Sequence, residues 1–413
     1  MVLCFARRLV FPCCGDDGHS VLLFQRPILR LVAQGQAWVA LFLILSGFVN
    51  ALKPVKLARA GNIESALSNL SVSSLRRPFR LALPAAAATV LSWFVCQLGA
   101  YETARNSDAY WLYTYTPAPS PSWGVAIEDL FIGLRNTWTF GIVNPYDQPQ
   151  WALPYFLQGS MMVFTALLVT TNMTPTYRML TLTGLAFWSF DLSYKFRDPL
   201  VGFAVFSGII LSEISLTNLP SKLGCFSLFL GIPIAILGLV LMSFPSDGPE
   251  QTQWTTFLLA FAKATFPKQI DYGRFYGTFG GVVLMAGIVM SPHLRALLSK
   301  PAITWLGKIS FPIYLLHGTL MRSFFAWILF FNAVPIDVEM QGDDGAEYLI
   351  KRYPLPGHLH IAVSVLMFAA VLLGASHVWA AKVEPWFGWM TKKAEDRMKT
   401  PSENRVVLPL RKE

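Results

Sequence analysis

One histidine and two hydroxyl side chains share a face of an apolar segment near the C-terminal end. Residues 305–318 read WLGKISFPIYLLHG, and in a helix Ser310, Tyr314 and His317 fall at positions i, i+4 and i+7. Ionisable groups inside a membrane span usually face the bundle interior or a wet cavity, and an imidazole exchanges protons near neutral pH. The stripe is a candidate reaction centre. A neutral histidine that hydrogen-bonds a neighbouring helix is the alternative, and spacing alone leaves both open.

Three arginines stand just before an alanine-rich apolar segment. The stretch SSLRRPFRLALP, residues 73–84, contains Arg76, Arg77 and Arg80, of which Arg76 and Arg80 share a helical face. Guanidinium groups suit bidentate binding of phosphate. Taken alone, the cluster is better explained by membrane topology and contacts with lipid headgroups.

The sequence offers no pattern for a metal site or a disulfide framework. Its five cysteines lack metal-type spacing and are odd in number: Cys4, Cys13, Cys14, Cys96 and Cys225. A further polar pair, Gln158 and Ser160, lies near the start of the apolar stretch WALPYFLQGSMMVF, residues 151–164. The stretch ALFLILSGFVN, residues 40–50, contains a Ser-Gly pair, whose small residues favour close packing of helices.

The composition is that of a membrane protein. Hydrophobic residues make up 54% of the 413 positions and charged residues only 14%, against about a quarter in soluble domains, and the mean hydropathy is +0.47. The apolar residues come in blocks that are long enough to cross the hydrocarbon core as helices. The net charge of +9 is spread between these blocks, so it indicates membrane topology rather than nucleic-acid binding.

We therefore predict an all-α, polytopic transmembrane helical bundle with about nine spans. The domain would extend over residues 26–390, between an N-terminal segment, 1–25, and a basic cytoplasmic tail, 391–413. The predicted spans are 31–52, 82–100, 151–171, 178–193, 199–215, 223–244, 275–291, 309–334 and 359–382. Two further segments, 126–143 and 254–267, are amphipathic and are expected at the membrane interface or as re-entrant segments.

Loop charges alternate as nine spans require. The connections at 53–80 and 292–308 are basic, as is the tail, and are expected in the cytoplasm, whereas the loops at 101–150 and 335–358 are acidic. The N-terminus does not fit, because nine spans place it outside although it carries Arg7, Arg8, Arg26 and Arg30. Either it departs from the rule or a preceding helix is absent.

An ordered set of these stretches resembles the integral-membrane acyltransferase-3 family in its fungal form. LFLILSGFVNALKP is similar to the family's "FFxLSGF" passage, SLRRPFRLALP to its arginine motif, and WALPYFLQGS to its "W-T-I-P-x-E-F-x-G-S" passage. LLSKPAITWLGKISFPIYLLHGTL resembles the "LGxISYxxYLxH" span, and KVEPWF the closing "E-P" signature. The resemblance covers about residues 26–390.

The resemblance implies an acyltransferase of the class that transfers groups other than amino-acyl groups. An acyl group, typically acetyl, would pass from a CoA thioester to a hydroxyl of a small molecule, with acyl-CoA as co-substrate and no bound cofactor or metal. By motif, Arg76, Arg77 and Arg80 would bind the donor, and His317 would position or deprotonate the acceptor, supported by Ser310 and Tyr314. Expected partners are the acceptor, acyl-CoA and membrane lipid, with no nucleic acid. By analogy with the family, the expected biological role is secondary metabolite biosynthesis, and the expected location is the endoplasmic reticulum or another endomembrane.

Two departures from the family pattern leave alternatives open. The histidine of the family's first span has no counterpart, since His19 lies in a polar stretch, and Phe156 stands where the family carries a glutamate. A catalytically degenerate member that serves as a binding or assembly subunit is therefore one alternative, and a membrane transporter is another. The aromatic loop at 111–123 is expected either to cover an acceptor pocket or to anchor at the interface.

Overall fold

The computed structural model describes residues 25–107, 109–217, 226–246, 248–266, 270–341 and 347–398. His19, Cys225 and the three N-terminal cysteines lie outside these ranges, as do most of the predicted N-terminal segment and the tail beyond residue 398.

Within the described residues, six helical segments are long and apolar enough to cross a membrane. They are Gly35–Arg59 (α2), Ile63–Gln97 (α3), Gln148–Thr170, Tyr272–Met290 (α13), Pro301–Phe330 and His358–Met398. The third segment consists of η3 (Gln148–Ala152) and α7 (Leu153–Thr170). The last two are each interrupted by a π-helical turn: α15 (Pro301–Leu320), η5 (Met321–Phe325) and α16 (Ala326–Phe330) form one, and α17 (His358–Val378), η6 (Trp379–Val383) and α18 (Glu384–Met398) form the other. Helices satisfy their own backbone groups, which is the condition for crossing lipid. The chain is a multi-pass membrane protein with a helical bundle fold.

Three more helices complete the predicted set. Two are short and apolar, Val201–Ser215 (α9) and Phe226–Met242 (α11), and the third is Pro175–Phe196 (α8). Every predicted span therefore coincides with a helix within the described residues, although positions 223–225 of one span lie outside them. The prediction of an all-α membrane bundle is confirmed, while six of the nine helices meet the length and hydropathy expected of a span on their own.

The boundaries of several spans were predicted wrongly, among them the start of α15 at Pro301, which was expected near residue 309. Helix α3 begins at Ile63 rather than near residue 82, so the arginine stretch lies within the helix and not in a loop. Asn62 caps this start by accepting a hydrogen bond from Ser65 N at 3.2 Å. Pro78 and Pro84 lie inside α3, although prolines usually mark a helix start or a kink. The last span likewise continues as a helix as far as Met398.

Shorter elements lie between the long helices. They are η2 (Leu29–Ala33), α4 (Glu102–Arg105), α5 (Tyr110–Tyr115), α6 (Trp123–Asn136), η4 (Pro249–Gln251), α12 (Gln253–Thr265) and α14 (Pro292–Leu298). Helices α6 and α12 occupy the two segments predicted as amphipathic. An antiparallel hairpin, β1 (Ile336–Gln341) and β2 (Glu347–Arg352), lies in the second acidic loop and was not predicted.

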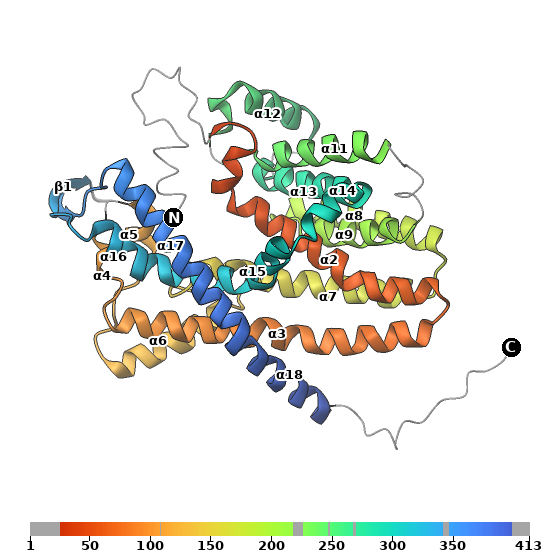
Figure 1. The fold of residues 1–413 in the computed structure, drawn as a ribbon, viewed down its shortest axis with the longest axis horizontal. Helices are drawn as coiled ribbons and strands as arrows, with labels where there is room; N and C mark the ends of the chain where they lie inside the picture. Colours follow the sequence, from red (N-terminus) through yellow and green to blue (C-terminus); the bar gives the residue numbers. More distant parts are fainter. Residues whose placement is uncertain are drawn as a thin grey trace.

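The described residues of the two acidic loops meet at one end of the bundle. Figure 1 shows α4, α5, α6, α16 and β1 gathered there. The loops are joined by the backbone, since Tyr353 N donates to Asn106 O at 2.8 Å. Their shared location agrees with their shared charge, which predicted that both lie on one side of the membrane.

Helix α2 lies in the middle of the bundle and packs closely against α9. Gly47 of α2 and Gly208 of α9 face each other, and a Cβ atom at either would overlap the backbone of the other helix. Small residues at a crossing let two backbones approach in this way. Gly47 of the Ser-Gly pair thus has the packing role expected of a small residue.

A buried charge cluster fastens the opposite end of the bundle. The carboxylate of Glu213 on α9 is fully buried and pairs with Arg178 of α8 and with Arg59 of α2, the latter at 2.6 Å. Two guanidinium groups therefore share one carboxylate, and the cluster fixes the ends of three helices relative to one another.

Candidate active site

The hydrogen bonding of His317 defines which ring nitrogen can act as a base. Its Nδ1 lies 2.7 Å from the carbonyl oxygen of Tyr314 and 3.2 Å from that of Ile313, both in its own helix. A carbonyl oxygen only accepts, so Nδ1 carries the hydrogen of the neutral ring. The lone pair then resides on Nε2, which is the arrangement a general base requires.

Tyr314 connects this histidine to the segment that precedes α7. Its ring centroid lies 6.2 Å from that of His317, and its hydroxyl donates to the carbonyl oxygen of Pro149. The structure places two members of the predicted stripe, Tyr314 and His317, next to each other in a half-buried position, and their role in catalysis stays a prediction. The Ser310 hydroxyl instead donates to Gly307 O at 2.8 Å within its own helix.

Phe156 lies in the same site. Its ring packs edge-on against Tyr314 with a centroid distance of 6.3 Å, and on its other side against Phe42 of α2 at 6.3 Å. The position at which the family carries a glutamate thus adjoins the histidine stripe, and in this chain it is apolar. No carboxylate reaches His317 from this turn of α7.

Of the three arginines, Arg77 is the one that points into the bundle. Its Nε donates to the Ser160 hydroxyl of α7 at 2.9 Å, and its Nη2 donates to Ser46 of α2 at 3.3 Å. Asn50, one turn further along α2, also donates to Ser46 at 3.1 Å. Three helices therefore meet at a polar centre around this guanidinium.

The other two arginines are placed differently. Arg76 pairs with Glu395 of α18, whose side chain is buried while that of Arg76 is 38% exposed. Arg80 is exposed. The three arginines thus do not converge on one point, although they lie within about one turn of α3.

Helix α7 brings the two predicted groups of residues into one site. Ser160 contacts Arg77, and Phe156, which lies four positions earlier in the chain, contacts Tyr314. The Ser160 hydroxyl also donates to Phe156 O at 2.7 Å. Four residues are about one helical turn, a rise of about 6 Å. Arg77 and the stripe of Tyr314 and His317 therefore contact α7 at positions about one turn apart.

Sequence reasoning missed two fully buried charges beside this site. Asp147, just before η3, and Arg322, in the π-helical turn after α15, both have 0% exposure. Arg322 donates to Tyr146 O at 2.7 Å and to Tyr115 O at 3.0 Å, which fixes the aromatic loop against α15. Burial raises the pKa of Asp147 to about 7, opposed by the nearby Arg322 charge. The location of Arg322 inside a predicted span could have marked it as a functional candidate, whereas nothing in the sequence marked Asp147.

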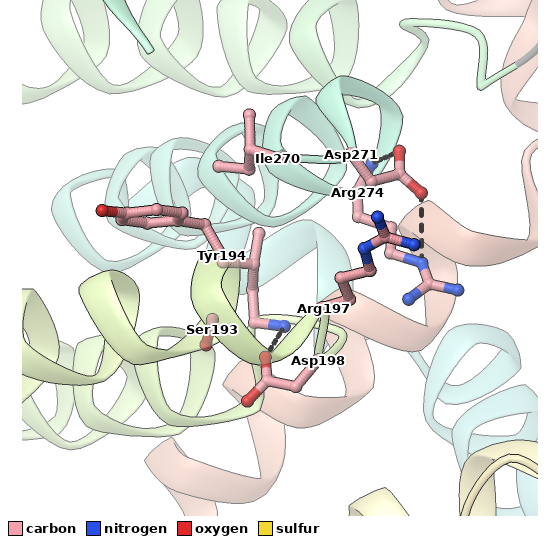
Figure 2. Close-up of a pocket in the computed structure, with 8 residues that line it drawn as sticks. Ser193, Tyr194, Arg197, Asp198, Ile270, Asp271 and Arg274 are labelled. Carbon is pink, nitrogen blue, oxygen red and sulfur yellow. Dashed lines mark hydrogen bonds and ion pairs between the residues drawn. The ribbon is translucent and has the colours of Figure 1, made fainter. Parts of the chain in front are cut away.

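A charged pocket of about 410 Å³ lies elsewhere, between the end of α8 and the start of α13 (Figure 2). Its lining includes Arg197, Asp198, Asp271 and Arg274, and Arg274 Nε lies 3.3 Å from Asp271 Oδ2. None of the predicted site residues lines it. Among the residues that the structure describes, no three His, Cys, Asp or Glu side chains are grouped to hold a metal ion.

Comparison with known proteins identifies the class. The acyltransferase-3 family, described as an acyltransferase domain, matches residues 15–379, and the chain belongs to this family. It is similar to O-acetyltransferase PaAT-1 of Phomopsis amygdali, with 26% identity over 74% of this chain and 65% of that protein. It is also similar to acyltransferase clz18 of Cochliobolus lunatus, with 24% identity over 78% of this chain and 76% of that protein. The chain thus spans just under two thirds of the length of PaAT-1. No solved structure matches the chain significantly.

Proposed function

We propose that this protein is a membrane-bound O-acyltransferase that moves an acetyl group from acetyl-CoA to a hydroxyl of a small molecule. The observation that carries the proposal is the role of α7, which joins Arg77 through Ser160 to the Tyr314 and His317 stripe through Phe156. Family membership supplies the class of reaction. The name of the relative PaAT-1, an O-acetyltransferase, supports acetyl as the transferred group.

His317 is the base of the proposed reaction. Its Nε2 takes the proton of the acceptor hydroxyl, and the oxygen attacks the thioester carbonyl carbon. The carbon–sulfur bond breaks, and the leaving thiolate takes the proton from Nε2, so that the products are an ester and free CoA. Ordering of the imidazole by the Tyr314 carbonyl keeps Nε2 in the basic form at the start of each cycle.

The arginines bind the donor in this proposal. Arg77 acts in the interior, and exposed Arg80 lies one turn away, where it can meet the donor phosphates. Arg76 is the weakest of the three donor-side candidates because Glu395 already neutralises it. The acceptor site lies at the histidine stripe, beneath the aromatic loop that Arg322 holds through Tyr115.

The wider setting is proposed by analogy. The relatives are fungal acyltransferases, and a hydroxylated secondary metabolite is the acceptor class we infer. The positive charge of the loops supports a cytoplasmic C-terminus, and an endomembrane such as the endoplasmic reticulum is the location we propose. The reaction requires acyl-CoA as co-substrate and no bound cofactor.

Acetyl transfer in microsomes tests the proposal. Microsomes from cells that express the chain are incubated with radiolabelled acetyl-CoA and a panel of alcohols: a sterol, a monoterpene alcohol and an alkyl glucoside. The expected result is labelled ester that is absent from vector-only microsomes and is formed at a strongly reduced, residual rate by the His317→Ala variant. Arg295→Ala serves as the control, because Arg295 is an exposed arginine on the separate helix α14. Failure of wild type to form ester, or to release CoA thiol, overturns the proposal.

A catalytically silent binding subunit is the second candidate, and the apolar Phe156 favours it. Such a protein would bind acetyl-CoA in the same microsomes without forming ester or releasing thiol. Saturable binding of labelled acetyl-CoA without turnover would therefore replace the first proposal with the second.

A further inference from the structure

The loop before α7 holds a carboxylate in a fully buried position. Asp147 has 0% exposure, and its Oδ2 accepts a hydrogen bond from Gln150 Nε2 at 2.6 Å. Its Oδ1 is buried without a hydrogen-bond partner among the described residues. A buried carboxylate oxygen without a hydrogen-bond donor costs free energy of folding. Stability alone therefore does not explain an aspartate at this position.

A polar network fixes this carboxylate in place. Gln150 is its centre: its Oε1 accepts from Thr89 and from Thr137, each at 3.1 Å, and its Nε2 also donates to Ala85 O at 3.1 Å. All the side chains of this network are buried. Hydrogen bonds from α3 and from the segment after α6 therefore hold Gln150, and Gln150 in turn sets the orientation of the Asp147 carboxylate.

The carboxylate lies against the helix that carries the histidine. A Cβ atom at Gly318 would lie only 3.2 Å from Asp147 Oδ1, so the glycine allows α15 to approach this oxygen. Gly318 directly follows His317 in the chain. A larger side chain at this position would separate the carboxylate from α15.

Residues 146–149 run along one stripe of this helix. Tyr314, Gly318 and Arg322 occupy positions i, i+4 and i+8, so they share a face. They contact, in the same order, Pro149 O, Asp147 and Tyr146 O. The stripe thus aligns the loop with the helix residue by residue, and His317 lies beside it.

We propose that Asp147 is the positioning carboxylate of the reaction centre and acts through His317. This inference rests on the acyltransferase function proposed above. When Nε2 takes the acceptor proton, the imidazole becomes positively charged next to Gly318, and the Asp147 carboxylate stabilises that charge until the proton passes to the leaving thiolate. Asp147 thereby supplies, from a different segment, the carboxylate that Phe156 does not provide.

The charges around Asp147 are compatible with this role. The titratable and charged side chains near it are Arg322, Tyr314 and Tyr101. Arg322 favours the ionised carboxylate, while burial favours the neutral form more strongly. The carboxylate therefore ionises near neutral pH, and a positive imidazole appearing beside it would favour the ionised form further.

Steady-state kinetics of Asp147→Asn test the proposal. The assay uses the microsomes and acetyl-CoA of the experiment above, with release of CoA thiol as the readout. We expect kcat to fall at least tenfold while the KM for acetyl-CoA stays within twofold. Asp129→Asn is the matched control, because Asp129 is a partly exposed aspartate of α6 whose Oδ2 also accepts one hydrogen bond, from Ser120 at 2.7 Å.

A double-mutant cycle separates a role through His317 from a merely structural one. In a His317→Ala background, Asp147→Asn is expected to change the residual rate by less than twofold, because the group it assists is gone. Independent, multiplicative losses overturn the inference, and so does a single variant with wild-type kcat. Both leave the proposed function intact, whereas a wild type that makes no ester and releases no thiol overturns both.

A second pair of variants keeps the proposal testable should Asp147→Asn not fold. Gly318→Ala places a methyl group against Asp147 Oδ1, whereas Gly307→Ala on the same helix meets nothing within 4 Å. We expect a several-fold lower kcat for Gly318→Ala and wild-type kcat for Gly307→Ala. Equal kcat for the two folded variants contradicts the inference.

Discussion

Arg77 of α3 donates a hydrogen bond of 2.9 Å from Nε to the hydroxyl of Ser160 on α7. The same guanidinium reaches Ser46 on α2 at 3.3 Å, so one side chain connects three helices. The planar fork of an arginine serves two partners from fixed directions in this way. The contact makes Arg77 both a structural link and the interior member of the arginine cluster.

Replacement of Arg77 by lysine is expected to separate charge from geometry. Lysine keeps the positive charge and three donors but lacks the planar fork, so it cannot reproduce the fixed directions in which Nε meets Ser160 and Nη2 meets Ser46. We expect the KM for acetyl-CoA to rise about tenfold, equivalent to about 1.4 kcal/mol, in the microsomal assay. Arg295→Lys should leave this KM unchanged. A KM for Arg77→Lys within twofold of wild type would show that the fork is not used for the donor.

The apolar character of position 156 also gives a prediction. Phe156 is 8% exposed and lies between the rings of Phe42 and Tyr314. Phe156→Glu would bury a carboxylate among aromatic rings, which costs more than the smaller packing loss of Phe156→Leu. The glutamate variant should therefore melt at a lower temperature than the leucine variant in detergent at pH 7. A glutamate variant as stable as wild type and faster in transfer would contradict this view of the site.

The Glu213 cluster predicts a large effect on stability without an effect on catalysis. Glu213→Gln leaves the buried guanidinium of Arg178, and that of Arg59, without a carboxylate, which costs about 3–5 kcal/mol for a buried pair. The melting temperature should fall strongly while the KM for acetyl-CoA at low temperature stays unchanged. Asp191→Asn, which breaks an exposed pair with Lys195, should change the melting temperature only slightly because solvent screens the pair. Similar melting temperatures for the two variants would refute a stabilising role of the cluster.

The salt bridge between Arg76 and Glu395 should hold α18 against α3. Because Glu395 is buried and distant in sequence from its partner, Glu395→Gln removes a tertiary link rather than a local one. Trypsin should then cut more rapidly after Lys392 and Lys393, which lie in the same helix. Unchanged cleavage rates in detergent would show that apolar packing alone retains α18.

Much of the fold follows from the sequence because apolar length is a strong signal. Blocks of hydrophobic residues located all nine helices, and loop charge predicted that the two acidic loops share one end of the bundle. The start of α3 was predicted wrongly because its local sequence is misleading. Clustered charges such as Arg76, Arg77 and Arg80 are typical of a loop between spans, and prolines such as Pro78 and Pro84 are typical of the first turn of a helix. Tertiary partners such as Glu395 and Ser160 let those residues remain helical.

The site was predictable only where it lies on one helix. Helical spacing placed Tyr314 and His317 together, since both lie on α15. It also put Ser310 in the stripe, where the structure shows a hydroxyl engaged with its own backbone. Asp147 belongs to an irregular segment, and its burial depends on Gln150, Thr89 and Thr137. No periodicity encodes such a contact, so folding in three dimensions is needed to reveal it.

The burial of Asp147 predicts a specific dependence of stability on pH. Burial raises its pKa from 3.8 to about 7, so between these values the folded protein binds more protons than the unfolded chain. Stability contributed by the protonated carboxyl is thus complete at low pH and is lost as the pH rises toward 7, by up to about 1.4 kcal/mol per pH unit. Asp147→Asn has no such titration.

Melting temperatures of wild type and Asp147→Asn in detergent, measured from pH 5 to pH 8, check this. Relative to wild type, the asparagine variant should gain stability as the pH rises, because only wild type must bury a carboxylate that is becoming charged. The partly exposed Asp129→Asn is the control and should run parallel to wild type. A constant difference between wild type and Asp147→Asn across the range would mean that Asp147 does not change its protonation on folding, and that Arg322 compensates its burial fully.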